Sequence, residues 1–168
     1  IFFKNLFILL CFLFIINGSN LVDGFNGLLA IHVIILNSIL LFINSMTGQN
    51  DLIFNIISQN ILIFIFFLFN FPNAKMFLGD SGSYLLGGLL GLNVVKTSNL
   101  NPEISPFFFA AILFYIFFEV FFSFFRKLVQ KKSPLQPDQN HFHMLTFYLI
   151  KKSNYKNPNA LNGFLINL

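Results

Sequence analysis

Long apolar runs separated by short polar segments are the feature that most constrains how this chain can fold. A helix that crosses a bilayer needs about 20 mostly apolar residues, because all its backbone hydrogen bonds must be made internally. Runs that approach this length cover residues 1–16, 28–46, 52–71, 84–95 and 106–125. Only 10% of the residues are charged, against about a quarter in a soluble domain. The sequence therefore predicts an all-α fold, a polytopic bundle of transmembrane helices with about five spans.

The ends of the chain indicate a truncated domain. Residues 160–168 read as the beginning of a sixth span, and the first residues are already apolar and lack an initial Met. No charged region precedes a small-residue cleavage site, so no signal peptide is expected. The single Cys11 excludes a disulfide framework within the chain. We expect one integral membrane domain over residues 1–168, cut at both ends, with a short surface helix at 144–152.

The charges predict how the bundle is oriented. Strict alternation of the spans places residues 17–27, 72–83 and 126–143 on one side, hereafter the first, second and third polar segments. Segments 47–51 and 96–105 fall on the other side, where Lys96 is the single basic residue. Most basic residues lie on or just beyond the first side: Lys75, Arg126, Lys127, Lys131, Lys132, Lys151 and Lys152. The positive-inside rule then makes this side cytoplasmic. The net charge of +4 is thereby explained by the membrane, and no nucleic-acid partner is expected.

The first polar segment carries Asn20, Asp23 and Asn26, which recur at every third residue. One helical turn would bring such residues near one another. A carboxylate and two amides at a membrane boundary suit a metal ion or a polar nucleotide. The alternative is a helix cap followed by a turn, which the same residue types favour. We expect His32, further along, to be structural or interfacial.

The second polar segment ends in Gly79, Asp80 and Ser81, directly before a span that contains glycines. A helix N-terminus attracts phosphate, and an aspartate is a hard oxygen ligand suited to Mg²⁺. The alternative is plain N-capping by Asp80 or Ser81. The spacing of four between Ser83, Gly87 and Gly91 predicts a face for close helix packing.

The third polar segment combines Arg126 with His141 and His143, which follow a Pro-Asp pair. A positive-inside stop signal with a kinked loop explains part of the charge. Zinc is disfavoured because no third ligand of a suitable type lies nearby. Binding of an anionic diphosphate by Arg126, Lys132, His141 and His143 fits better. Glu119 lies inside the fifth run and is either a functional carboxylate or the partner of a nearby cation such as Arg126.

Together the three segments resemble the polyprenyl-phosphate N-acetylhexosamine-1-phosphate transferases, glycosyltransferase family 4. The resemblance rests on NGSNLVDGFNGL at 17–28, MFLGDSGS at 76–83 and SPLQPDQNHFH at 133–143. The order of the motifs and the intervening spans also match, over nearly the whole chain. The third motif is closer to the undecaprenyl-phosphate GlcNAc-1-phosphate branch than to the muramoyl-pentapeptide branch.

The resemblance implies an enzyme of the bacterial inner membrane that faces the cytoplasm. It would transfer N-acetylhexosamine 1-phosphate from a UDP-N-acetylhexosamine to polyprenyl (undecaprenyl) phosphate and release UMP, as the first membrane step of a cell-envelope glycan. The implied cofactor is Mg²⁺, with Mn²⁺ as the alternative. The catalytic residues would be Asp23 and Asp80, of which Asp80 is the metal ligand. The implied substrate-binding residues are Asn20, Asn26, Arg126, His141 and His143.

Two departures from the family pattern bear on the donor sugar and the metal geometry. Asn26 stands where members often have a second aspartate, and Met144 stands where they often have another histidine. The acidic pair of an earlier cytoplasmic loop is absent from the chain, so the chain alone is expected to be inactive. A membrane transporter and a non-enzymatic scaffold or inactive remnant of the transferase remain the alternative interpretations.

Overall fold

The computed structural model describes residues 2–131, 133, 140–152 and 155–168. Within these residues every regular element is a helix, which confirms the predicted all-α membrane bundle. The elements are α1 (Phe2–Val22), α2 (Leu28–Thr47), α3 (Asn50–Asn70), α4 (Gly79–Leu100), α5 (Pro106–Ile112), α6 (Phe114–Val129), α7 (Phe142–Lys151) and α8 (Pro158–Leu165). The predicted surface helix at 144–152 corresponds to α7.

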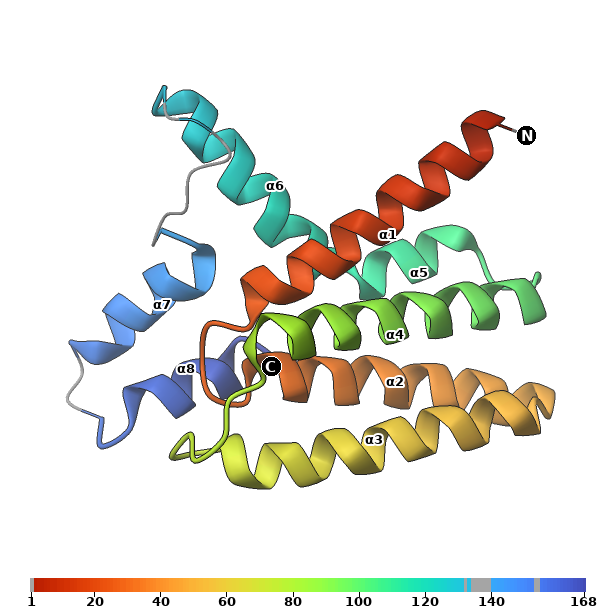
Figure 1. Ribbon diagram of the computed structural model, residues 1–168, viewed down its shortest axis with the longest axis horizontal. Helices are drawn as coiled ribbons and strands as arrows, with labels where there is room; N and C mark the ends of the chain where they lie inside the picture. The colour runs from red at the N-terminus through yellow and green to blue at the C-terminus, as the bar shows by residue number, and fades with distance from the viewer. Residues whose placement is uncertain (1, 132, 134–139, 153–154) are drawn as a thin grey trace.

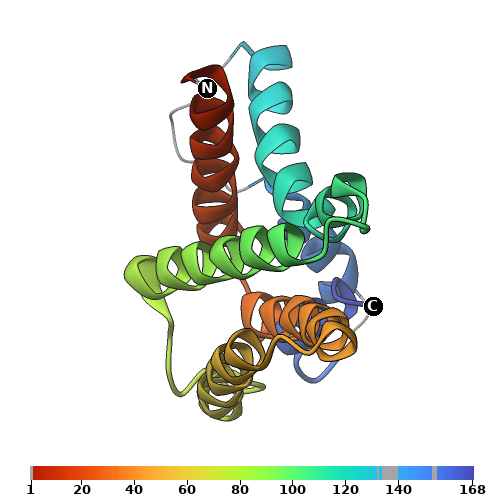
Figure 2. The same cartoon turned by 90° about the vertical axis from the view of Figure 1, so that its right-hand side faces the viewer.

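Helices α2, α3 and α4 run side by side, and α1 crosses them with α6 at its side (Figures 1 and 2). Helix α1 packs against both α4 and α6, while α2 packs against α3 and α4. The turn between α2 and α3 is tight because Gly48 takes a left-handed φ of +71°, which glycine adopts without strain. The core lies between α1, α2 and α4, where Val22, Leu28, Leu40 and Leu90 are fully buried.

Helices α1 and α4 approach closely along the predicted small-residue face. A Cβ atom added to Gly87 would lie 2.7 Å from Oγ of Ser19 and 3.0 Å from the Cα atom of Ile16. A Cβ atom added to Gly91 would lie 3.0 Å from the Phe12 ring. Ser83, at the start of the same face, is fully buried. The expectation of a packing face is confirmed, because only very small side chains leave room for the two backbones.

Amide side chains join α2, α3 and α4 within the apolar bundle. Nδ2 of Asn93 donates to Oδ1 of Asn37 at 3.1 Å and to Oε1 of Gln59 at 2.7 Å. Nδ2 of Asn37 in turn donates to Oδ1 of Asn60 at 3.1 Å. We call Asn37, Gln59, Asn60 and Asn93 the amide ladder. Polar groups in an apolar medium must be paired with one another, so the ladder specifies which faces of the three helices meet.

In the described part of the chain, fewer helices qualify as spans by length and composition than the five apolar runs predicted. Within the described residues three helices, α1, α2 and α3, are long and apolar enough to cross a membrane. The pair of helices α5 and α6 is a fourth candidate if the two are counted as one bent span. Helix α4 has 22 residues but is too polar to qualify, because one face carries amides, glycines and Thr97. The expected span at 106–125 is that bent pair, α5 and α6, with an angle of 66° between them. Residues 160–168 contain most of α8, and whether they begin a further span stays a prediction.

The helix ends confirm which polar segments lie together. In Figure 1 the C-terminal end of α1, the N-terminal ends of α2 and α4, and helices α7 and α8 lie toward one end of the bundle. The α2–α3 turn and the C-terminal end of α4 lie at the other. This grouping agrees with the alternation deduced for the polar segments, although α1 continues through Val22. Asn20 is therefore part of helix α1, whereas the sequence had placed it in the polar segment between two spans.

We expect Asn37→Ala and Asn93→Ala to be energetically coupled, because each removes the partner of the other. The coupling free energy should be about 0.6 kcal/mol, the average for interhelical hydrogen bonds in a membrane protein. A double-mutant cycle on unfolding in detergent measures it. The control cycle pairs Asn93→Ala with Ser58→Ala, since the Ser58 hydroxyl donates to Phe54 of its own helix. Equal coupling in both cycles would contradict a role for the ladder in joining helices.

Candidate active site

Asn20 connects the first polar segment to the second. It lies in the last turn of α1, and its Nδ2 donates to Oδ1 of Asp80 at 3.0 Å and to Oγ of Ser83 at 2.9 Å. Oγ of Ser83 donates to the backbone carbonyl of Asp80 at 3.0 Å. Because the small face of α4 lets α1 approach, an amide on one helix reaches a carboxylate 60 residues away. Two residues that the sequence assigned to one site are thus in contact.

Asp80 lies in the first turn of α4, and its side chain is exposed. The residue before the helix, Leu78, makes no side-chain capping bond. The chain enters the helix through Gly79, which has a left-handed φ of +67°. The expected alternative, N-capping by Asp80 or Ser81, is thus not what the structure records for this helix. The Asp80 carboxylate instead meets Asn20 and is open to a ligand from solvent.

Asp23 lies in the turn between α1 and α2, close enough to Asp80 for their charges to interact. The pKa of the Asp23 carboxyl is raised from 3.8 to about 7, first by burial and second by the negative charge of Asp80. Two carboxylates that disfavour each other's ionisation are stabilised by a cation between or beside them. The structure therefore brings together three of the residues that the sequence assigned to the active site, namely Asp23, Asp80 and Asn20.

Asn26 has a different environment. Its Nδ2 donates to the carbonyl of Pro72 at 2.8 Å, and its backbone N–H donates to Oδ1 of Asn159 at 2.8 Å. Nδ2 of Asn157 also donates to the Pro72 carbonyl, at 3.1 Å. Asn26 thus ties the first polar segment to the second and to α8. Its assignment as a nucleotide ligand stays a prediction.

Asn70 supplies a second tie between the same two segments. It is the last residue of α3 and is buried. Its Oδ1 accepts from the backbone N–H of Gly27 at 2.6 Å, and its Nδ2 donates to the carbonyl of Met76 at 2.8 Å. Sequence reasoning placed Asn70 inside an apolar span and missed this role. An amide at the end of an apolar run, two residues before Pro72, was the signal available.

His143 lies beneath the turn that carries Asp23. It is 2% exposed, and its Nδ1 lies 2.8 Å from Oε1 of Glu119. A Cβ atom added to Gly24 would come within 2.6 Å of Nε2 of His143. The third polar segment therefore reaches the first through a histidine ring packed on a glycine. Glu119 pairs with the histidines: Nδ1 of His141 lies 3.8 Å from its Oε2.

The remaining residues of the third segment are placed less centrally. The rings of His141 and His143 stack in parallel with centroids 5.4 Å apart. Arg126 lies in the last turn of α6 with its guanidinium carbon 5.7 Å from the Phe122 ring centroid. Figure 1 shows this end of α6 well apart from the first turn of α4, and the assignment of Arg126 to the substrate stays a prediction. Lys132 and residues 134–139 of the predicted motif lie outside the described residues.

The donor set at Asp80 fits a hard divalent cation. Mg²⁺ typically takes one or two carboxylates and completes its shell with water and substrate phosphate oxygens. Exposed Asp80 and its neighbour Asp23 supply two such carboxylates. Among the described residues no group of three or more His, Cys, Asp or Glu side chains is arranged to hold a metal. Asp80 and Asp23 are therefore the described residues that could hold such a cation together with substrate oxygens.

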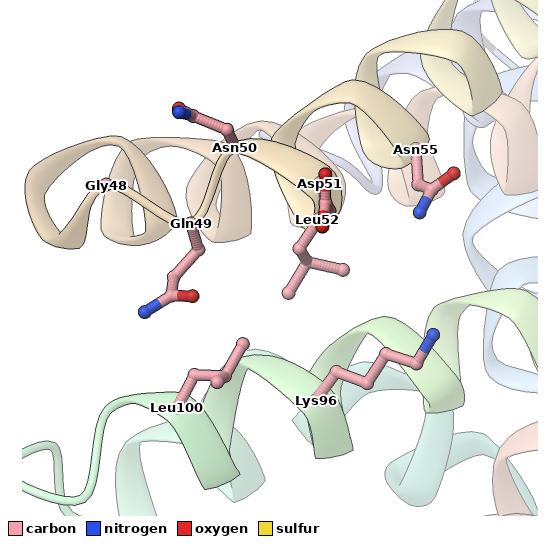
Figure 3. A pocket seen from close by; sticks show the side chains of 8 residues that line it. All are labelled: Gly48, Gln49, Asn50, Asp51, Leu52, Asn55, Lys96 and Leu100. Atoms are coloured by element: carbon pink, nitrogen blue, oxygen red, sulfur yellow. The ribbon is translucent and has the colours of Figure 1, made fainter.

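A cavity of about 590 Å³ lies at the opposite end of the bundle (Figure 3). Its lining comes from the α2–α3 turn, the first turns of α3 and the end of α4. Lys96 and Leu100 of α4 face Gln49 and Leu52 across it. None of the residues assigned to the candidate active site lines this cavity. The cavity and the candidate residues therefore lie at opposite ends of the bundle.

The raised pKa of Asp23 predicts a specific pH dependence of stability. Between pH 3.8 and about 7 the folded state binds more protons at Asp23 than the unfolded state, so stability falls as pH rises through this window. Asp23→Asn should remove the part of this fall in stability that the Asp23 carboxyl causes. Thermal unfolding in detergent with EDTA, at about pH 5 and about pH 8, measures it. Asp51→Asn, at the exposed start of α3, is the control and should retain the wild-type fall. If Asp23→Asn lost stability with pH as steeply as the wild type, the raised pKa of Asp23 would be contradicted.

Comparisons with known proteins identify the family of the chain. The sequence model of the family described as Glycosyl transferase family 4 matches residues 1–98. The chain is 38% identical over 137 residues to the undecaprenyl-phosphate alpha-N-acetylglucosaminyl 1-phosphate transferase of Thermotoga maritima. That match covers 82% of the chain and 41% of the relative.

A second relative is the phospho-N-acetylmuramoyl-pentapeptide-transferase of Streptococcus pneumoniae. It is 42% identical over 74 residues, which cover 44% of the chain and 23% of the relative. The chain thus spans about two fifths or less of the length of these curated relatives. No solved structure matches. The match to the family model and to the relatives shows that the chain belongs to glycosyl transferase family 4.

Proposed function

We propose that the protein transfers N-acetylhexosamine 1-phosphate from a UDP-N-acetylhexosamine to a polyprenyl phosphate in the membrane and releases UMP. The names of the two relatives, both phosphosugar transferases, support the reaction class. The reaction would be the first membrane step of a cell-envelope glycan. Its site would face the cytoplasm from the bacterial inner membrane, as the distribution of basic residues supports.

The observation that carries the proposal is the contact of Asn20 with Asp80 and Ser83. It joins two polar segments at one end of an otherwise apolar bundle. A reaction between a water-soluble nucleotide sugar and a lipid phosphate requires polar groups at that boundary. A transport site would require them near the middle of the spans. There the amides of the ladder bond to one another, as expected of helix packing.

The chemistry is a displacement at phosphorus. An oxygen of the polyprenyl phosphate attacks the β-phosphorus of the donor, and the bond from that phosphorus to the bridging oxygen of UMP breaks. A bound Mg²⁺, or alternatively Mn²⁺, would neutralise charge on the diphosphate. Asp80 would hold the cation, and Asn20 fixes the direction of the Asp80 carboxylate. The remaining contribution of the protein is positioning.

Further roles follow from the placement of the other residues. Asp23 would be the second catalytic carboxylate, next to Asp80. Asn26 would help hold the nucleotide, and Arg126 and His141 would contact diphosphate or sugar. His143 was assigned to the same contacts, but its burial under the Asp23 turn favours an indirect role.

The test uses the full-length protein in detergent with undecaprenyl phosphate, Mg²⁺ and a panel of UDP-N-acetylhexosamines, and it scores UMP release. We expect a lipid-linked product with one donor, lost on addition of EDTA. Asp80→Asn should lower the rate by about 100-fold or more, the scale of removing one electrostatic contact to the transition state.

Asp51→Asn is the matched control, because Asp51 is also an exposed aspartate in the first turn of a helix but lies at the far end. It should retain wild-type activity. Folded wild-type protein that releases no UMP from any donor, beside a working positive control, would reject the proposed function. Equal losses in the two variants would reject the assignment of the site to the Asp80 end.

A further inference from the structure

Glu119 is a fully buried carboxylate inside an apolar helix, α6. Its Oε1 accepts from the hydroxyl of Tyr115 at 2.9 Å and from the backbone N–H of His143 at 3.2 Å. Its Oε2 accepts from the backbone N–H of Phe142 at 3.2 Å. Nδ1 of His143 is the nearest group of all, 2.8 Å from Oε1. Donors therefore surround the carboxylate.

These donors determine which nitrogen of His143 carries hydrogen. A carboxylate that already accepts two backbone N–H bonds and a hydroxyl is stabilised as an anion, and an anion can only accept. Nδ1 of His143 must then donate to Glu119. The other ring nitrogen, Nε2, is directed away from Glu119 and toward Gly24.

The contact between His143 and Gly24 links this pair to the candidate site. A Cβ atom at position 24 would lie 2.6 Å from Nε2 and 3.0 Å from Cδ2 of His143. The ring therefore fills the space in which a side chain would stand. It also meets the Phe25 ring edge-on, with centroids 5.5 Å apart. The backbone that follows Asp23 thus rests directly on the imidazole.

We infer that Glu119 is a positioning residue of the active site: it holds His143 through Nδ1, and the held ring sets the Asp23–Gly24 turn. The inference rests on the proposed function, in which Asp23 is a catalytic carboxylate beside Asp80. A shift of this turn would displace Asp23 from Asp80 without breaking the bundle. Glu119 touches no reacting group and acts only through His143.

The cost of a buried carboxylate supports a role beyond packing. An ionisable group within an apolar span is expensive, and a leucine would fill the same volume without that cost. The role of Glu119 is to fix the direction of its hydrogen-bond donors. A carboxylate in this position orients two backbone N–H groups and a ring together, which an apolar side chain cannot do.

The experiment compares Glu119→Gln with Ser123→Ala in the full-length protein. Ser123 is also buried on α6, one turn further on, and is the matched control. Glu119→Gln should lower kcat by about 10-fold or more, the scale of losing an outer hydrogen-bond partner of a site histidine. The KM for the UDP-sugar should remain unchanged. Ser123→Ala should retain wild-type kcat.

Two further measurements separate positioning from general stabilisation. In protein with ¹⁵N-labelled histidine, the wild type should show hydrogen on Nδ1 of His143, identified by the signal that His143→Ala removes. Glu119→Gln should shift that Nδ1 signal, because an amide oxygen accepts more weakly than a carboxylate, while Ser123→Ala leaves it unchanged. In a His143→Ala background, Glu119→Gln should cause no additional fall in kcat. Multiplied losses in the double variant would overturn the inference, because Glu119 would then act by another route.

Gly24→Ala covers the case in which Glu119→Gln does not fold. It presses on His143 from the opposite side while Glu119 stays intact, so it should also lower kcat by about 10-fold or more. Wild-type kcat in either Glu119→Gln or Gly24→Ala, in an active enzyme, would overturn this inference alone. A wild-type protein that releases no UMP would instead reject the proposed function together with it.

Discussion

The hydrogen bonds from Asn20 to Asp80 and Ser83 are the interaction on which the candidate site depends. They exist because Gly87 allows α4 to lie against the backbone of α1 at Ile16. A larger residue on this face would separate the helices, and the amide would no longer reach the carboxylate. Close packing inside the bundle and the chemistry at its end are therefore one feature of the structure.

Buried polar groups explain much of the remaining organisation. In an apolar surrounding an unpaired amide or carboxylate is costly, so each must find a partner when the helices pack. The amide ladder satisfies this requirement between α2, α3 and α4. Asn70 satisfies it between Gly27 and Met76 at the site end, and Glu119 satisfies it with the start of α7. The same rule that restricts helix packing also holds the loops of the site in place.

Sequence reasoning was most successful where a physical constraint acts locally. The hydrophobic length required of a spanning helix located α2 and α3 within a few residues, and alternation grouped the polar segments at one end. It failed where tertiary contacts override local composition. Helix α4 is longer and more polar than expected because its polar face is buried against α1 and α2. The bend after Ile112 interrupts an apolar run that carries no glycine or proline at that point.

By itself the sequence determined the all-α membrane class, the end of the bundle that carries the polar segments, and the candidates Asp23 and Asp80, because hydrophobic length and residue chemistry are local properties. Only the tertiary structure decided that Asn20 meets Asp80, that Asn70 ties two polar segments, and that Glu119 pairs with His143. These pairs are separated by 24 to 60 residues along the chain. Their partners are set by which helix faces pack together, and no local pattern in the sequence encodes that choice.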